Sequence, residues 1–398
     1  MTRLLRDTME EWAGEARVPA GLADRALRRR AWTPYGAAVL VAAMIAAVAV
    51  FVTGQRAPEP AVRPAAGIEL PARPSPAPAD VRADLEHSPP ASLIAAGGLA
   101  VSAYYVTEVE RPQDAPPRTR RTWSLYDPRT GGYERTAYAW VDVAPGLQVA
   151  AVIEGDLLGR RVGVLDLNTR QMLGWFELEH SVGAVAWSPD GTKILATAYS
   201  GYPDLLQGEG DEIGPLMRES PRIGYYVIDV PAGTSGYHEL KPLPGLLSRA
   251  EVSGNARQDL GWSLDGELIW SPTNTRPDRL FYTLDGQERP APDGQRYVAY
   301  SRASATSPDG RLVLGEDGLP TKITEAATGK VAGRQRVLQL HAWADDDNVI
   351  ALGCAGKCAD EFNGGPVLVS VDGSRMVQLG LNRRSGGEGD YRWVLTPR

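Results

Sequence analysis

Two cysteines, Cys354 and Cys358, are the only thiols in this 398-residue chain. Outside the cytoplasm a nearby pair usually oxidises, and a separation of four residues meets disulfide geometry in a turn. A dithiol redox couple is the alternative, but it normally has two residues between its cysteines and a supporting fold. A zinc site would need third and fourth ligands, which the neighbouring sequence does not supply. We therefore expect a disulfide between Cys354 and Cys358, and no metal site.

Enzyme motifs are missing from the sequence. It contains no Gly-x-Ser-x-Gly nucleophile elbow, no His-Glu-x-x-His zinc motif and no phosphate-binding loop. Its histidines are scattered through the linker and the strand connections, where a structural or solvent-facing role is expected: His87, His180, His238 and His341. We accordingly predict no catalytic residues and no cofactor.

Binding is the chemistry that remains, and it is expected on long loops held by a rigid scaffold. The longest insertion, residues 200–222, is acidic and is interpreted either as a lid that contacts a partner or as a disordered acidic insertion. Its carboxylates do not have the spacing of a calcium loop. The candidate binding residues come from three long connections: Glu108, Arg111, Tyr202, Asp204, Arg276 and Asp278.

A strand–turn–strand unit repeats along the second half of the chain and would position these loops. Its clearest turns are Ser188-Pro189-Asp190-Gly191, Ser263-Leu264-Asp265-Gly266 and Ser307-Pro308-Asp309-Gly310. In such turns Pro presets φ, Asp can bond its own backbone, and Gly adopts the left-handed conformation that closes a short loop. Six turns of this series alternate with six outer-hairpin turns. Repeats of about 40 to 50 residues built from short strands indicate the blades of a β-propeller.

The repeat resembles that of the TolB-type and WD-repeat-like propeller superfamily, over about three quarters of the chain. The match is good at Ser188–Gly191 and Ser307–Gly310 and loose in the first and last units. The resemblance implies an all-β fold with six blades, plus or minus one, over residues 93–398. Together with a basic N-terminal flank, a single apolar anchor and a proline-rich segment after it, the repeat makes the chain similar to membrane-anchored propeller proteins of the actinobacterial type.

Phasing the repeats separates the two ends of the predicted ring. The turns within hairpins stay short, whereas the alternate connections are long; we call the two ends the tight-turn face and the loop face. Tryptophans at inner-strand phase are expected to pack between blades. Residues 391–397 resemble an inner strand without a successor, so we expect them to complete the first blade and cover its edge.

Residues 36–53 contain no charge and are long enough to span a bilayer as a helix. A cleaved signal peptide is the alternative, but its apolar core is usually shorter and ends at a small-residue cleavage site. Arginines crowd the N-terminal flank, which predicts a cytoplasmic N-terminus and an extracytoplasmic C-terminal domain. We therefore predict a single-pass cell-membrane protein anchored by residues 36–53.

Two segments of different composition flank this helix. Residues 1–35 form a cytoplasmic segment, interpreted either as a docking peptide or as a topogenic segment at the membrane. Residues 54–92 are rich in proline and are predicted to form a disordered stalk. The formal net charge of −7 disfavours nucleic acid as a partner.

These features favour a membrane-tethered, non-enzymatic propeller that binds a protein or a cell-envelope ligand through its loop face. One alternative is a hydrolase or lyase with its site in the central channel. Another is a relay in which the cytoplasmic segment reports what the outer domain senses. The sequence does not determine the oligomeric state or the ligand.

Overall fold

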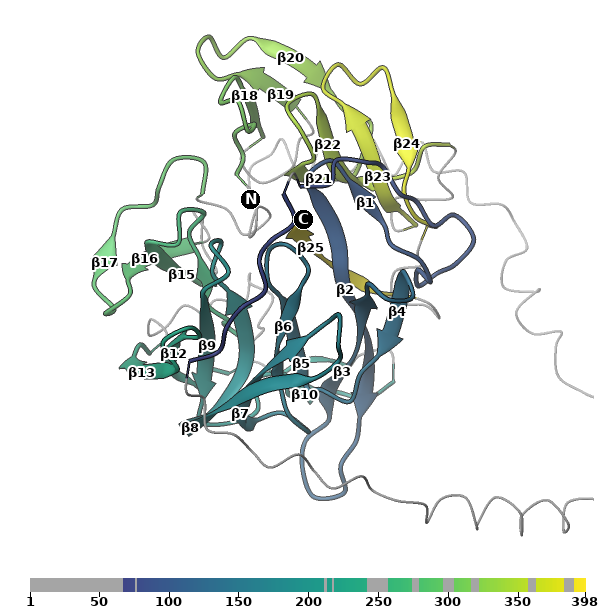
Figure 1. Cartoon of the computed structure of the whole chain (residues 1–398). Coiled ribbons are helices and arrows are strands. Elements are labelled where there is room, and N and C mark those ends of the chain that lie inside the picture. Colours follow the sequence, from purple (N-terminus) through teal and green to yellow (C-terminus); the bar gives the residue numbers. More distant parts are fainter. Residues whose placement is uncertain are drawn as a thin grey trace, which may run out of the picture. The chain divides into compact units, whose positions relative to one another are not determined.

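The computed structural model describes residues 67–75, 77–210, 213–216, 218–241, 257–273, 279–295, 304–315, 322–356, 363–382 and 390–398 (Figure 1). All of them belong to the second of two compact units, residues 61–398. The predicted cytoplasmic segment, the transmembrane helix and residues 54–66 of the stalk lie outside the described residues. None of the described residues forms a helix long and apolar enough to cross a membrane.

The regular elements are antiparallel β-strands that pair largely in chain order. The first sheet contains β1 (Ala95–Ala96), β2 (Leu99–Glu110), β3 (Arg118–Asp127), β4 (Gly132–Arg135) and the C-terminal β25 (Arg392–Pro397). The second contains β5 (Trp140–Val143), β6 (Val149–Ile153), β7 (Gly159–Asp166), β8 (Met172–Trp187), β9 (Lys193–Tyr199), β12 (Arg222–Asp229) and β13 (Thr234–Glu239).

The long strand β8 belongs to two successive groups of strands. Its first part, from Met172 to Glu177, pairs with β7. Its last part, from Val182 to Trp187, pairs mainly with β9. The seven-stranded sheet is therefore two four-stranded meanders that share β8.

Three further sheets follow in the described part of the chain. One contains β14 (Gly261–Trp262), β15 (Leu268–Pro272), β16 (Arg279–Thr283) and β17 (Glu288–Arg289); the next contains β18 (Leu312–Leu314), β19 (Lys322–Glu325) and β20 (Val331–Arg334). The last contains β21 (Gln339–Trp343), β22 (Asn348–Gly353), β23 (Gly365–Ser370) and β24 (Met376–Gln378). A small pair, β10 (Leu206–Gln207) and β11 (Gly214–Pro215), lies in the long insertion. These sheets form the all-β, propeller-like arrangement that the repeats predicted.

Tryptophans join neighbouring sheets through their inner strands. The indole Nε1 of Trp262 donates to the carbonyl of Ala186 in β8 at 2.9 Å. That of Trp343 donates to the carbonyl of Ala305 at 3.1 Å. Both rings are buried. The expected packing of inner-strand tryptophans between sheets is therefore confirmed for these two.

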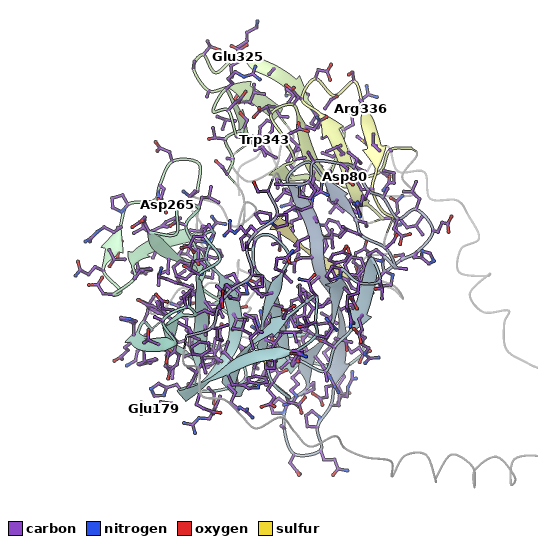
Figure 2. All side chains as sticks on the ribbon, viewed as in Figure 1. Asp80, Glu179, Asp265, Glu325, Arg336 and Trp343 are labelled. Carbon is purple, nitrogen blue, oxygen red and sulfur yellow. The ribbon has the colours of Figure 1, made fainter. Side chains whose placement is uncertain are left out.

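The repeated turns owe their shape to hydrogen bonds within each turn. The Ser188 hydroxyl donates to the Asp190 carboxylate, and that carboxylate accepts from the Thr192 amide at 3.1 Å. The Ser188 hydroxyl in turn accepts from the amide of Lys193 at 2.9 Å, while Gly191 has a φ of 68°. The same bonds form around Ser263 and Asp265 (Figure 2), Ser307 and Asp309, and Ser370 and Asp372.

The C-terminal strand lies in the first sheet, where the sequence analysis expected it. β25 runs antiparallel to β2, with Leu99 opposite Pro397 and Tyr104 opposite Trp393. The buried hydroxyls of Ser102 and Thr396 lie 2.7 Å apart across this pair. The two ends of the propeller sequence are thus joined by a ladder of backbone hydrogen bonds.

The structure corrects the prediction of a disordered stalk for the described residues between 67 and 92. The Ile68 amide donates to the carbonyl of Val230 at 3.2 Å, and Arg82 exchanges backbone hydrogen bonds with Ala95 at 2.8 and 3.0 Å. The guanidinium of Arg73 donates to the carbonyl of Pro189 in a repeated turn. An extended, proline-rich chain keeps its remaining backbone groups free for such bonds, so this segment is packed on the sheets although its composition is typical of a linker.

Candidate binding site on the loop face

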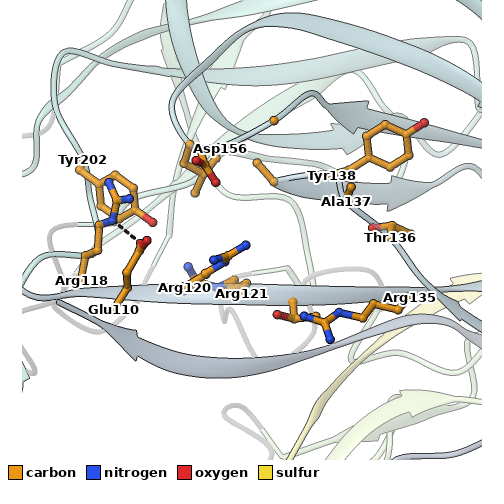
Figure 3. A pocket seen from close by; sticks show the side chains of 14 residues that line it. Glu110, Arg118, Arg120, Arg121, Arg135, Thr136, Ala137, Tyr138, Asp156 and Tyr202 are labelled. Carbon is orange, nitrogen blue, oxygen red and sulfur yellow. Dashed lines mark hydrogen bonds and ion pairs between the residues drawn. The ribbon is translucent and has the colours of Figure 1, made fainter. Parts of the chain in front are cut away.

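A hollow of about 70 Å³ lies on the loop face, over the first two sheets (Figure 3). It is bounded by the outer ends of β2 and β3, the connection from β4 to β5, the connection from β6 to β7, and Tyr202 of the long insertion. Four arginines line it, together with two carboxylates: Arg118, Arg120, Arg121, Arg135, Glu110 and Asp156. The lining therefore carries an excess of positive charge, although the chain as a whole is acidic.

Arg118 and Glu110 form one wall as an ion pair. The Arg118 Nε lies 2.6 Å from a carboxylate oxygen of Glu110. The same guanidinium lies over the ring of Tyr202, 4.8 Å from the ring centroid. The hydrogen bond from Arg118 lowers the pKa of Glu110. Both charges are thus paired with each other, and Glu110 is held as a carboxylate.

One of the lining arginines, Arg121, belongs to a buried ionic cluster. We call Arg121, Asp204, Arg257 and Asp259 the Asp204 cluster. Arg121 donates two hydrogen bonds to Asp204, at 2.6 and 3.2 Å. Arg257 donates to the same carboxylate at 2.6 Å and to Asp259 at 2.9 Å. The side chains of Asp204 and Arg257 are only 4 % and 6 % exposed, so the ion pair between these two residues is shielded from water.

Aromatic rings enclose the Asp204 cluster. The guanidinium carbons of Arg121 and Arg257 lie 5.3 and 4.5 Å from the ring centroid of Trp140. Burial alone would raise the pKa of Asp204, but the positive charges of Arg257 and Arg121 outweigh it and lower that pKa. Asp204 is therefore ionised, and it links the insertion to β3 and to the connection before β14.

Backbone hydrogen bonds hold the insertion in the same place. The Thr119 amide donates to the carbonyl of Asp204 at 2.9 Å, and the Leu206 amide donates to that of Pro117 at 2.7 Å. The hydroxyl of Tyr202 donates to the carbonyl of Thr119 at 3.1 Å. Where it is described, the insertion is therefore folded onto β3, unlike the disordered acidic loop that was one interpretation of its sequence.

Several donors at the hollow have no partner within the described residues. Arg120 and Arg135 are exposed, and within the described part neither guanidinium takes part in a hydrogen bond or an ion pair, although the charge of Arg120 also helps to lower the pKa of Glu110. The hydroxyl oxygen of Thr136 and the Nε of Arg121 are buried without a hydrogen-bond partner. Arg120 and Arg135 come from the neighbouring strands β3 and β4 (Figure 3). The hollow thus offers the two exposed guanidinium groups of Arg120 and Arg135 to an incoming acceptor.

The residues predicted for binding lie at different distances from the hollow, and two of them are not described. Tyr202 lines the hollow, whereas Asp204 lies behind it with its carboxylate occupied by two arginines. Glu108 and Arg111 are exposed near Glu110 but do not line the hollow. Arg276 and Asp278 lie outside the described residues.

The lining arginines were missed by the sequence analysis. Three of them stand together in the run Arg118-Thr119-Arg120-Arg121. That run, placed at a predicted strand end on the loop face, was the available signal. The fourth, Arg135, comes close only because β3 and β4 pair.

Of the two cysteines, only Cys354 is among the described residues. Cys354 takes part in a disulfide bond. Cys358 lies outside the described residues, so its pairing with Cys354 stays a prediction. Within the described residues, no group of three or more His, Cys, Asp or Glu side chains is arranged to hold a metal ion.

The sheets and the repeated turns define an all-β, propeller-like fold. No family model and no curated protein matches the sequence. Solved structures that match include the Cps50 (Swd1) β-propeller domain of Myceliophteria thermophila, at 11 % identity and a TM-score of 0.35, covering 72 % of this chain and 88 % of that one. TolB from Acinetobacter baumannii matches at 15 % identity and a TM-score of 0.33, covering 74 % and 66 %.

Hydrazine synthase from Kuenenia stuttgartiensis also matches, at 12 % identity and a TM-score of 0.30, over 59 % of this chain and 63 % of that one. This chain therefore spans less than two thirds of the hydrazine synthase and TolB chains. These similarities concern the fold alone and carry no conclusion about activity or partners.

Proposed function

We propose that this protein is a membrane-tethered, extracytoplasmic propeller of six blades that binds a protein or cell-envelope ligand through its loop face without catalysing a reaction. The observation that carries the proposal is the arginine-lined hollow. Its unpaired donors stand on the loop face, and their surroundings are fixed by a buried ionic cluster. A rigid scaffold with exposed, unpaired donors is suited to recognition.

The blade count rests on strand pairing. β8 serves one meander with its first part and the next with its last part, so the seven-stranded sheet counts as two blades. The first sheet and the three that follow β13 add four more. On this count β25 is the innermost strand of the first blade, and the ring closes by pairing the two ends of the propeller sequence.

The tether and the compartment rest on the sequence and on one bond. Residues 36–53 have the length and the basic N-terminal flank of a membrane anchor. The disulfide at Cys354 agrees with an oxidising compartment. Together they support a C-terminal domain on the outer side of the membrane.

A binding role without turnover agrees with the side chains at the hollow. The residues that line it include no His, Cys or Ser. Glu110 is a poor general acid, because its hydrogen bond with Arg118 lowers its pKa. Asp156 then has no second carboxylate free to share acid–base work.

Affinity capture tests this function. Full-length protein in detergent is used to capture ligands from envelope extracts, and the same preparations are assayed for breakdown of what is captured. Ala137→Trp fills the exposed rim of the hollow, and Ala327→Trp adds the same bulk to a tight turn after β19. We expect Ala137→Trp to lose the captured ligand and Ala327→Trp to keep it, with no turnover.

Equal loss in both variants would contradict binding through the loop face. Conversion of the captured ligand would indicate the hydrolase or lyase. Deleting residues 1–31 separates a tethered binder from a relay, because capture should survive the deletion while a downstream cytoplasmic response would not.

A further inference from the structure

We propose that the hollow between Arg120, Arg135 and Thr136 is a binding site for a phosphate group. The inference rests on the proposed function and deepens it, because it assigns the chemistry by which the loop face holds its ligand.

The charge of the site calls for an anion. Arg118 is neutralised by Glu110, and Arg121 faces Asp204. Arg120 and Arg135 retain their charges, and Asp156 is the only other carboxylate in the lining. A positive recess on an acidic protein attracts anions locally while the rest of the surface repels them.

The number of donors favours phosphate over carboxylate. In this structure a single arginine already satisfies a carboxylate with two hydrogen bonds, as Arg121 does for Asp204. The hollow offers two exposed guanidinium groups, those of Arg120 and Arg135. Donors from separate strands suit the several oxygens of a phosphate, and arginine forks match phosphate oxygens in pairs.

The surroundings of the two exposed arginines are held in place by the fold. Arg120 lies on β3 and Arg135 on β4, and these strands pair. The Thr136 hydroxyl and the Arg121 Nε are hidden from solvent, so the exposed guanidinium groups are the donors that a phosphate would meet. The rigid backing of Arg121 by the Asp204 cluster keeps part of the site in place before the ligand arrives.

Calorimetric titration of the full-length protein in detergent tests the site, with inorganic phosphate, methyl phosphate and acetate as separate probes. We expect phosphate to bind, and acetate to bind at least tenfold more weakly. Arg120→Gln and Arg135→Gln should each weaken phosphate binding about tenfold, the loss of one charge-assisted hydrogen-bonding group. Arg336→Gln, an exposed arginine between β20 and β21 (Figure 2), is the matched control and should bind phosphate as the wild type does.

Arg120→Lys gives a second check that preserves charge. It should recover only part of the affinity, because a lysine cannot form the two-pronged contact. Equal affinity for methyl phosphate assigns the site to a phosphate ester on a larger ligand, whereas preference for inorganic phosphate assigns it to the free ion; both results support a phosphate site.

The proposal is overturned if phosphate does not bind, if acetate binds as tightly, or if the Arg120 and Arg135 variants behave like Arg336→Gln. These results are distinct from a failure of the proposed function. Capture that depends on Ala137 without phosphate binding would leave the loop-face function standing and remove the phosphate site. Phosphate binding without any captured ligand would leave the phosphate site standing and would contradict the proposed loop-face function.

Discussion

Removing the carboxylate of Asp204 should destabilise the propeller and release the long insertion. Asp204→Ala leaves Arg121 without a carboxylate, in a position where only 11 % of its side chain is exposed. Arg257 would keep Asp259 and the face of Trp140. The variant therefore leaves the nearly buried charge of Arg121 without a counter-ion and removes one of the two carboxylates that pair with Arg257.

The size of the effect follows from burial. Breaking a buried ion pair by removing one partner costs about 3 to 5 kcal/mol, because the remaining charge is left uncompensated. Since Arg257 retains one carboxylate, we expect a loss of about 3 kcal/mol. At an unfolding entropy of about 2.1 cal/mol/K per residue, and for a domain of roughly 300 residues, this lowers Tm by about 5 °C.

Thermal unfolding of the full-length protein in detergent measures this loss, with Asp156→Asn as the matched control. Asp156 is an exposed carboxylate at the same hollow, and its variant should change stability by less than about 0.5 kcal/mol. Hydrogen exchange supplies a local measure, because the Leu206 amide that bonds to Pro117 should exchange faster in Asp204→Ala. A loss below about 1 kcal/mol, or the same loss in Asp156→Asn, would refute the role assigned to the cluster.

Three further predictions concern the scaffold. Deletion of residues 390–398 should cause gross loss of solubility by exposing an edge of β2; a truncated protein that stays folded and monomeric in size-exclusion chromatography would argue against ring closure by β25. In thermal unfolding, Gly97→Ala should destabilise the protein more than Gly131→Ala. Both glycines have a positive φ, but a Cβ at Gly97 would lie 2.0 Å from the Ala344 carbonyl oxygen, whereas a Cβ at Gly131 would meet nothing within 4 Å. Equal losses of stability in the two variants would contradict the steric explanation. Hydrogen bonds from Ser307 and from the Arg311 amide lower the pKa of Asp309 to about 2. The stabilisation that Asp309 contributes is therefore present above pH 4 and is lost as the pH falls toward 2. Asp309→Asn should make the free energy of unfolding less dependent on pH across that window, and an unchanged pH dependence would contradict this prediction.

The repeated turns could be predicted because their chemistry is local. In Ser188-Pro189-Asp190-Gly191, the serine and aspartate bond to amides within five residues. Only glycine adopts the positive φ of the last position at little cost. The pairing of β25 with β2 is long-range, and it could be predicted for a different reason, because an inner strand without a successor needs a partner. The sheets and the division of the ring into a tight-turn face and a loop face could therefore be predicted from the sequence.

The site depended on contacts that sequence patterns do not reveal. Arg121 and Asp204 are 83 residues apart, and their pairing follows from the insertion folding back onto β3. The attachment of residues 67–92 was missed for a related reason. The bonds of Ile68 and Arg82 join backbone groups, and composition says nothing about where a backbone amide finds its acceptor.

Site-specific photo-crosslinking in cells tests most directly whether the loop face is the binding surface. A photoreactive residue is placed at Arg111, exposed on the loop face, or at Arg311, exposed beside a repeated turn on the tight-turn face. We expect a discrete adduct from position 111 that Ala137→Trp abolishes, and none from position 311. An adduct from position 311 alone would contradict recognition through the loop face.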